Sequence, residues 1–366
     1  MNYQQSFAIF TDMKEKATYV IGLMSGTSLD GLDLVYVRFF KNAGISFEIL
    51  HGETIAYTVD WKNNLQKAIS FSDDRLMELD VEYGKLLGKI TNSFISKFKI
   101  EKIDFIASHG HTVFHDPDNG ITLQIGNGQE LAKLTHQKII CDFRTQDVEL
   151  GGQGAPLVPI GDELLFSEYD YCLNLGGFVN VSARKNGIRI AYDVCPVNIV
   201  LNHYVNSLGL AYDDKGKIAS GGSINKKLLL ELNSLKFYSQ SHPKSLGLEW
   251  VQQNIFPLID SYRLSLPDVL RTFIEHVAIQ ITEQLPKTDK KLLITGGGVF
   301  NNFLIARIQK LSKVHICIPS LEIINYKEAL IFAFLGLLRV ENKINVLASV
   351  TGAKRDHSSG KIYIDV

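Results

Sequence analysis

The feature that most constrains this 366-residue chain is an apolar run near its start that breaks at a small polar loop and then resumes. Residues 19–23 read YVIGL, residues 24–31 read MSGTSLDG, and residues 32–39 are again mainly apolar. The pattern predicts two strands joined by a tight turn. Gly26 and Gly31 can adopt positive φ and turn backbone N–H groups toward one point, where a phosphate would bind.

The side chains of this loop suit a nucleotide phosphate and its metal ion. Ser25, Thr27 and Ser28 supply hydroxyl donors, and Asp30 is placed to hold a hydrated Mg²⁺. No Gly-Lys-Ser/Thr follows and the chain returns as a strand, so this is not the strand-to-helix lysine loop. An ordinary β-hairpin with a polar turn is the alternative reading of this segment.

The same arrangement recurs in the second half of the chain. Residues 171–183 read as a strand, a glycine loop and a strand, and a third strand over residues 188–192 ends at Asp193. Residues 45–58 form the matching third strand of the first half. Two copies of this pattern are much harder to explain by chance than one. We therefore expect an α/β fold with two ribonuclease-H-like domains of the actin-like ATPase and sugar kinase type, facing a central cleft with nucleotide at its floor.

Domain boundaries follow from this duplication. We expect residues 1–140, joined by a returning segment at about 345–366, to form the N-terminal domain, and residues 141–344 to form the C-terminal domain. The glycine-rich residues 151–156 are expected to be a hinge or a substrate-facing loop, or else a plain interdomain connection. Periodic apolar residues and short apolar runs predict helices over residues 76–90, 266–285, 302–311 and 327–340, and strands over residues 104–108, 122–125, 138–141 and 314–318.

Composition excludes several partners. Lysine plus arginine (38) nearly balances aspartate plus glutamate (39), so the net charge of −1 offers no basic field for nucleic acid. The four cysteines are widely spaced without a Cys-x-x-Cys pair, which is typical of core residues in a reducing compartment. Residues 1–18 lack the apolar core of a signal peptide, and the longest apolar stretch, residues 329–338, is too short to span a bilayer. We expect a soluble cytoplasmic protein that does not act on membranes.

A second glycine-rich segment joins a strand to a helix. Gly296, Gly297 and Gly298 follow an apolar run and precede Asn301 and Asn302. Without side chains, this backbone lets a flat group lie on it, and a helix N-terminus favours a phosphate. The alternative is a plain strand-to-helix turn. With the two phosphate hairpins upstream, which include Gly176 and Gly177, we interpret the segment as part of an adenosine-diphosphate site.

Three charged residues are candidates for chemistry. Asp193, at a strand end, is either a general base toward a hydroxyl or water, or a cap before a proline turn. Arg144 either binds a substrate carboxylate or a transferring phosphoryl group, or forms a structural salt bridge to Asp142 or Asp147. Glu328, at the start of an apolar helix, is either an acid facing the cleft or a helix N-terminal charge.

Three histidines raise a metal alternative. His109 and His111 would share one face of a strand, and His115 follows four residues later, so a metal-dependent hydrolase on the same fold is a competing function. Gly110 and Thr112 suggest instead that the strand unwinds here, and no acidic ligand pattern completes a metal site. Hydrogen bonding to a polar substrate is the other reading.

Several blocks of sequence, in one order, resemble the anhydro-N-acetylmuramic acid kinases of bacterial wall recycling. The resemblance covers residues from Tyr19 to about Gly352. The blocks that carry it are residues 22–31, 108–112, 122–126, 142–144, 151–157, 174–177, 296–298 and 349–353.

The resemblance implies an ATP-dependent kinase, with Mg²⁺, that acts on 1,6-anhydro-N-acetylmuramic acid. In that family water adds at the anomeric carbon, the anhydro bridge opens, and the freed 6-oxygen takes the γ-phosphoryl group. Asp193 matches the family aspartate that serves as base toward the water, and a homodimer is also implied. We expect His109, Arg144 and Glu328 to bind the sugar. The ATP-phosphate hairpin corresponds to Gly26, Thr27, Ser28, Leu29, Asp30, Gly31, Leu32 and Asp33.

The chain departs from the family pattern at three places. After Asp193 the family usually has Thr-Gly-Pro-Gly-Asn, whereas residues 194–198 here read VCPVN. Cys195 and Val197 replace glycines beside the expected sugar pocket, and side chains there would narrow the pocket or displace the base. His111 stands where glutamine is common, and residues 325–327 (NYK) replace a Gly-Asp pair. A nucleotide-binding protein with lapsed kinase activity is therefore a further alternative.

Overall fold

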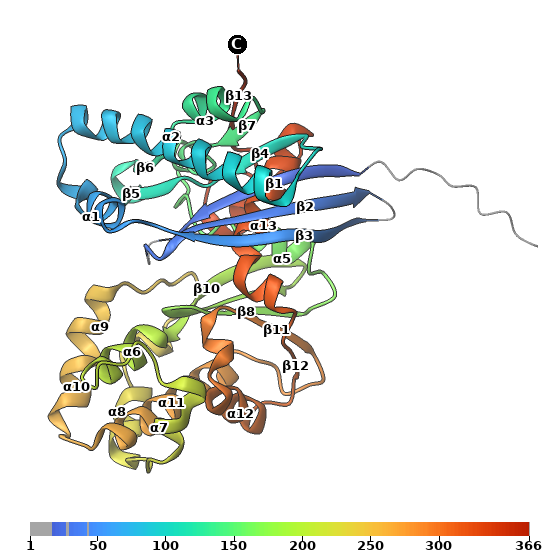
Figure 1. The fold of residues 1–366 in the computed structure, drawn as a ribbon. Helices are drawn as coiled ribbons and strands as arrows, with labels where there is room; N and C mark the ends of the chain where they lie inside the picture. Colours follow the sequence, from blue (N-terminus) through green and yellow to red (C-terminus); the bar gives the residue numbers. More distant parts are fainter. Residues whose placement is uncertain (1–16, 27–28, 42–43, 366) are drawn as a thin grey trace, which may run out of the picture.

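The computed structural model describes residues 17–26, 29–41 and 44–365 (Figure 1). In these residues the first β-sheet has six strands in the spatial order β13-β7-β4-β1-β2-β3. Its strands are β1 (Thr18–Ser25), β2 (Gly31–Lys41), β3 (Ile45–Ala56), β4 (Phe105–Ser108), β7 (Ile139–Cys141) and β13 (Lys361–Tyr363).

The second sheet has five strands in the order β10-β9-β8-β11-β12. In both sheets the first strand pairs antiparallel with the second and parallel with a later one, β1 with β2 and β4, and β8 with β9 and β11. This repetition confirms the predicted α/β fold of the actin-like type. The strands are β8 (Tyr171–Leu175), β9 (Phe178–Lys185), β10 (Ile188–Pro196), β11 (Lys291–Thr295) and β12 (His315–Cys317), with a separate β5 (His111–Asp116) and β6 (Ile121–Ile125) ribbon.

The helices flank these sheets (Figure 1). The first half contains α1 (Val59–Lys67), α2 (Asp73–Phe98), α3 (Gly128–Thr135) and α4 (Thr145–Glu149). The second half and the C-terminal segment contain α5 (Pro159–Leu164), α6 (Asn198–Asn206), α7 (Lys217–Ser220), α8 (Lys226–Asn233), α9 (Leu248–Asn254), α10 (Phe256–Ser261), α11 (Leu266–Glu283), α12 (Asn302–Leu311), α13 (Leu321–Val340) and α14 (Ala348–Thr351).

The long helices begin and end where local chemistry predicts. In α2 the Ser72 hydroxyl accepts a hydrogen bond from the Arg75 N–H, and Lys99 ends the helix in the left-handed conformation. In α11 the Ser265 hydroxyl accepts from the Asp268 N–H, and Pro267 occupies the first turn. None of the described helices is both long and apolar enough to cross a membrane.

Helix α13 lies between the two sheets. Alternate residues of a strand face opposite sides of its sheet, so Val20 of β1 packs with α13 whereas Ile21 packs with the α2 side. Cys172 of β8 and Leu293 of β11, in the second sheet, belong to the same core as α13. Residues 321–340 were expected in the C-terminal domain, yet α13 packs chiefly on β1, β2 and β4 of the first sheet. The exact domain division stays a prediction.

The close approach of α13 to β1 depends on Gly22. A Cβ at this position would overlap the carbonyl oxygen of Ala329 and lie 2.9 Å from the Cβ of Ala333. We predict that Gly22→Ala lowers the free energy of unfolding by about 1–3 kcal/mol, the usual cost of overpacking. Gly44→Ala is the matched control, because nothing lies within 4 Å of its Cβ position. Equal urea midpoints for the two variants would contradict this packing.

Candidate active site

The hairpin between β1 and β2 is the first candidate phosphate loop. Thr27 and Ser28 lie outside the described residues. Gly31, expected to adopt positive φ, instead begins β2, where a Cβ would overlap the carbonyl oxygen of Ile55 on β3. Leu29 has the positive φ, 57°. Strand pairing therefore explains Gly31, and phosphate binding by the loop stays a prediction.

Side chains of the same hairpin point in different directions. Leu32 is buried in the core between the first sheet and α2, and it pairs with Ser25 of β1 and Ile55 of β3. Asp30 is exposed, Gly26 is partly exposed, and Asp33 is partly buried on β2.

A buried network supports the end of β1. The His111 Nδ1 lies 3.0 Å from the Ser25 hydroxyl oxygen, which also accepts a 2.8 Å hydrogen bond from the Tyr57 hydroxyl. The Tyr57 and Tyr83 hydroxyl oxygens are 2.6 Å apart. Burial lowers the pKa of His111 to about 4, so its ring is neutral at neutral pH. The network fixes Ser25 directly beneath the loop, and no local sequence signal had indicated Tyr57 or Tyr83.

The loop between β8 and β9 is anchored on the start of α6. The Gly176 carbonyl accepts a 2.7 Å hydrogen bond from Asn198 Nδ2. The Gly177 carbonyl accepts from the N–H groups of Val197 and Ile199, at 2.9 and 3.3 Å. These contacts hold the second candidate phosphate loop by its carbonyl groups.

The glycine triplet after β11 packs beside this loop. Gly296 has φ of 85°, and a Cβ there would overlap Asn174 Oδ1, while a Cβ on Gly298 would lie 2.6 Å from the Cβ of Leu175. By contrast, nothing lies within 4 Å of the Cβ position of Gly297. The structure thus brings the two glycine segments together, and leaves Gly297 open to a flat ligand.

The helix predicted over residues 302–311 is confirmed as α12 (Asn302–Leu311), and a short turn separates it from the triplet. A short 3₁₀ turn, Gly297–Phe300, comes first, and α12 begins at Asn302. The Asn301 side chain accepts a 3.0 Å hydrogen bond from the Leu304 N–H. One N–H donor of the α12 N-terminus is therefore already used by a cap, and is not available to a phosphate.

Arg144 is held without a carboxylate partner among the described residues. Its Nε and Nη2 lie 3.1 and 2.9 Å from His109 Nε2, and its Nη1 donates to the Gly154 carbonyl at 2.7 Å. The alternative reading of Arg144, a structural salt bridge to Asp142 or Asp147, is not formed among the residues that the structure describes. Desolvation lowers the pKa of Arg144 to about 10, which leaves the guanidinium charged at neutral pH.

His109 orients this guanidinium. Its Nε2 accepts from Arg144, and its Nδ1 lies 3.0 Å from the Gly110 carbonyl oxygen, so the proton belongs on Nδ1. The buried ring lies 4.6 Å from that of Phe332 on α13. Desolvation and the charge of Arg144 lower the pKa of His109 well below its usual value. His109 therefore binds Arg144, and direct contact between His109 and a substrate stays a prediction.

Glu328 lies in the electrostatic neighbourhood of Arg144, and Asp33 lies in that of Glu328. Desolvation raises the pKa of Glu328; Arg144 partly offsets this rise, and Asp33 adds to it. Desolvation also raises the pKa of Asp33, although a 2.6 Å hydrogen bond from the Thr54 hydroxyl opposes the shift; the nearby Asp30 adds to it. Glu328 of α13 therefore lies near both the cation of Arg144 and the carboxylate of Asp33.

This donor set fits a magnesium ion bound together with a nucleotide. Neighbouring carboxylates such as Asp33 and Asp30 favour a hard divalent cation. Across the described residues, no three His, Cys, Asp or Glu side chains gather into a complete metal site. Mg²⁺ typically takes one or two protein carboxylates and completes its shell with water and phosphate oxygens.

The three histidines of the metal alternative have three different partners. His109 contacts Arg144, His111 contacts Ser25, and the His115 Nδ1 lies 3.2 Å from the Thr122 hydroxyl oxygen. Gly110, with φ of 72°, separates β4 from β5, so His109 does not lie on the strand that carries the other two. This arrangement does not favour a histidine metal centre.

Asp193 lies on β10 of the second sheet, beside a β-bulge. One carboxylate oxygen accepts from Asn180 Nδ2, and the other accepts from the Leu246 N–H at 2.7 Å. Desolvation raises the pKa of Asp193, and both hydrogen bonds oppose the rise. These partners belong to other segments, so the carboxylate does not cap the following turn. Sequence reasoning missed Asn180, which lies on β9 directly opposite Asp193.

The apolar residues that depart from the family pattern after Asp193 are buried. Val194, Cys195 and Val197 are at most 1% exposed and belong to the hydrophobic core of the second half. The expectation that they narrow a sugar pocket is wrong, because their side chains pack among apolar residues.

Comparison with known proteins relates this chain to one family. The chain matches the family model described as anhydro-N-acetylmuramic acid kinase over residues 18–365. A protein of that name from Sulfurimonas denitrificans is 31% identical over 368 residues, covering 94% of this chain and 99% of the relative. Another from Clostridioides difficile is 35% identical over 381 residues, covering 94% and 98%.

A solved structure is also similar, at a lower level. The ligand-bound xylulose kinase from Lactobacillus acidophilus aligns with 95% of this chain and 94% of its own, at 12% identity and a TM-score of 0.44. That similarity is too low to carry an argument. The family model and the identities suffice: the chain belongs to the anhydro-N-acetylmuramic acid kinase family.

Proposed function

We propose that this protein is an ATP-dependent kinase that opens the anhydro bridge of 1,6-anhydro-N-acetylmuramic acid and phosphorylates its 6-oxygen. The product is N-acetylmuramic acid 6-phosphate, formed in cell-wall recycling. The observation that carries this proposal is the family match across residues 18–365. The metal-dependent hydrolase is not favoured, because the three histidines bind separate partners.

Asp193 is the proposed general base. As the water oxygen bonds to the anomeric carbon, the bond from that carbon to the 6-oxygen breaks and the water proton passes to the carboxylate. The freed 6-oxygen then bonds to the γ-phosphorus as the bond to ADP breaks. A carboxylate fixed by Asn180 and the Leu246 N–H is held in one orientation, and its raised pKa makes it a stronger base.

Arg144 is the proposed anion-binding group. Its contacts with His109 and Gly154 use three of the five N–H donors of a guanidinium. The two that remain, on Nη1 and Nη2, suit a carboxylate of the sugar or the transferring phosphoryl group. Glu328 is the proposed polar contact for the sugar on the same side of the cleft.

We place the nucleotide between the first hairpin, with Gly26 to Asp33, and the paired glycine segments of the second half. Bound Mg²⁺, held through Asp30 or Asp33, would neutralise charge that develops on the phosphates. A reaction that uses ATP suits the cytoplasm, which we propose as the compartment. The two-domain division stays a prediction, as does the homodimer implied by the family. Light scattering, which measures the mass of the particle in solution, would test the homodimer.

The reaction itself is tested by mass spectrometry in ¹⁸O-labelled water. We predict a phosphorylated sugar carrying one heavy oxygen at the anomeric carbon. Asp193→Asn should lower kcat by roughly 10²–10⁴-fold, because a general base contributes that much, while ATP affinity changes little. A phosphorylated sugar without heavy oxygen would mean that the phosphoryl group is transferred to a sugar whose anhydro bridge is intact. A protein that binds ATP but forms no phosphorylated sugar would be a lapsed kinase.

The pH dependence tests the base separately. Asn180→Ala removes a hydrogen bond that favours the charged carboxylate, so the pKa of Asp193 should rise further. A base works only when deprotonated; the acidic limb of kcat/KM should therefore move to higher pH. Asn254→Ala, which loses a 2.9 Å hydrogen bond to the Trp250 carbonyl on α9, is the control. An acidic limb that stays in place would mean that another group titrates.

Arg144→Ala should raise the sugar KM or lower kcat while the protein stays folded, since Arg144 has no ion-pair partner to leave behind among the described residues. Arg144→Lys should restore little, because a lysine cannot make the same forked contacts. Steady-state kinetics with each substrate varied measures both effects. An unchanged sugar KM and kcat would remove Arg144 from the site.

A further inference from the structure

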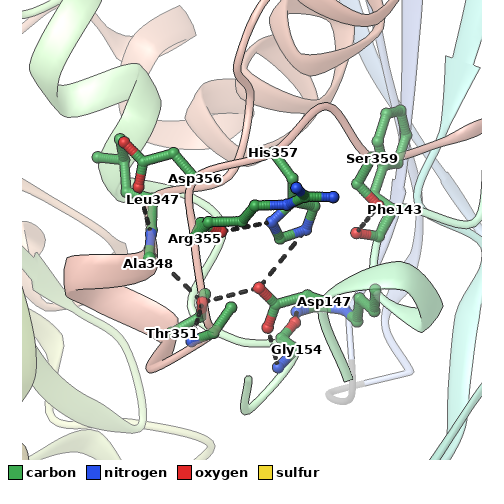
Figure 2. Close-up of polar contacts among 12 residues, drawn as sticks. Phe143, Asp147, Gly154, Leu347, Ala348, Thr351, Arg355, Asp356, His357 and Ser359 are labelled. Atoms are coloured by element: carbon green, nitrogen blue, oxygen red, sulfur yellow. Dashed lines mark hydrogen bonds and ion pairs between the residues drawn. The ribbon is translucent and has the colours of Figure 1, made fainter. Parts of the chain in front are cut away.

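The C-terminal segment reaches back to the loop that holds Arg144. In Figure 2 the hydroxyl of Thr351, at the end of α14, donates a 2.7 Å hydrogen bond to Asp147 Oδ1. The Thr351 carbonyl accepts a 2.8 Å hydrogen bond from the Gln153 N–H. Thr351 therefore binds both the buried carboxylate after β7 and the glycine-rich connection that follows it.

The glycine-rich connection wraps around Asp147. The Gly154 N–H donates to Asp147 Oδ2 at 2.6 Å, and the Gly152 N–H donates to the Asp147 carbonyl at 2.8 Å. A Cβ on Gly152 would overlap Asp147 Oδ2, and Gly154 has φ of 66°. These glycines are needed for the close approach, which sets the direction of the Gly154 carbonyl.

That carbonyl is the one that accepts from Arg144 Nη1 at 2.7 Å. A continuous series of hydrogen bonds thus runs from Thr351 through Asp147 and Gly154 to Arg144. Asp147 has no exposed surface, so it cannot touch a substrate. A buried carboxylate is held in place by the groups that donate hydrogen bonds to it. Removing one of these donors leaves a buried acceptor unsatisfied, which costs free energy. The next group, His357 Nε2, lies 3.6 Å from Asp147 Oδ1.

The same segment contacts the strand of the proposed base. The Ser349 hydroxyl, on α14, donates at 2.8 Å to the Arg189 carbonyl on β10, the strand that carries Asp193. Helix α14 is therefore bonded on one side to the loop of Arg144 and on the other side to β10.

We propose that Thr351 is a positioning residue for Arg144: its hydroxyl fixes Asp147, which fixes the Gly154 carbonyl that, with His109, aims the guanidinium. The inference rests on the proposed function for the role of Arg144, but the hydrogen-bond series that it invokes does not. A merely structural role, in which Thr351 only fastens the C-terminal segment, would leave the kinetics of the folded enzyme unchanged.

The kinetic test compares Thr351→Val, which loses the hydroxyl at similar volume, with Thr351→Ser, which keeps it. We expect Thr351→Val to lower kcat/KM for the sugar by about 10–10²-fold, since small misplacements of a binding group cost this much, with the ATP KM little changed. Thr351→Ser should restore activity. Thr91→Val is the matched control, because buried Thr91 loses only a 2.7 Å hydrogen bond to the Leu87 carbonyl in α2.

A double-mutant comparison separates positioning from stability. If Thr351 acts through Arg144, Thr351→Val should add no further loss in an Arg144→Ala background. The same fold-loss in both backgrounds would overturn the proposal. Should Thr351→Val fail to fold, Thr351→Cys, with a weak donor of similar size, serves in its place and should give an intermediate loss.

Amide hydrogen exchange gives a readout that needs no activity. The Gly154 amide, measured in a peptide from the 150–156 segment, should exchange faster in Thr351→Val than in wild type or Thr351→Ser. Unchanged exchange would overturn the positioning role even if the enzyme is a kinase. If exchange changes as expected but wild type forms no phosphorylated sugar, the proposed function fails and the positioning of Arg144 stands.

Discussion

The close packing of α13 on β1 is the constraint on which the rest of the structure depends. Because Gly22 has no side chain, the α13 backbone reaches the sheet at Ala329 and Ala333. The same helix then places Phe332 against the ring of His109, whose Nε2 accepts from Arg144. The close approach of α13 to β1 therefore positions Phe332, and Phe332 in turn contacts the histidine that binds Arg144.

The second turn of α13 places a buried charge, that of Lys327, in this core. Lys327 Nζ lies 2.7 Å from Asp162 Oδ1 of α5, and both side chains are almost fully buried. Desolvation lowers the pKa of Lys327, but Asp162, together with Cys172 and Glu328, raises it, and the net shift of the pKa is upward. A buried pair costs desolvation of both ions, and loss of either partner is strongly destabilising. The Lys327 that departs from the family pattern thus joins two helices instead of facing the cleft.

The two sheets contribute different chemistry. The first brings Arg144 near the carboxylate of Glu328, and the second holds Asp193 by donors from its own half. Every described hydrogen bond of the Asp193 carboxylate stays within the second half. In the proposed reaction a ligand between the sheets would meet a base on one side and a cation on the other. This arrangement fits addition of water to the anomeric carbon and transfer of the γ-phosphoryl group from ATP to the freed 6-oxygen.

The sequence by itself determined the repeated strand–loop–strand pattern, the long helices and the family, because alternation, periodicity and glycine loops are local properties. It also identified Asp193 and Arg144 as candidates. It missed the short helices α6 to α10, whose few turns give too little periodicity, and left the partners of each candidate open.

Only the tertiary structure decided those partners. The bond between Thr351 and Asp147 spans 204 residues of sequence, and Asn180 meets Asp193 through strand register. The same holds for the burial of Val194, which follows from the direction in which β10 turns its side chains. Such contacts depend on how distant segments pack, and packing leaves no local pattern in the chain.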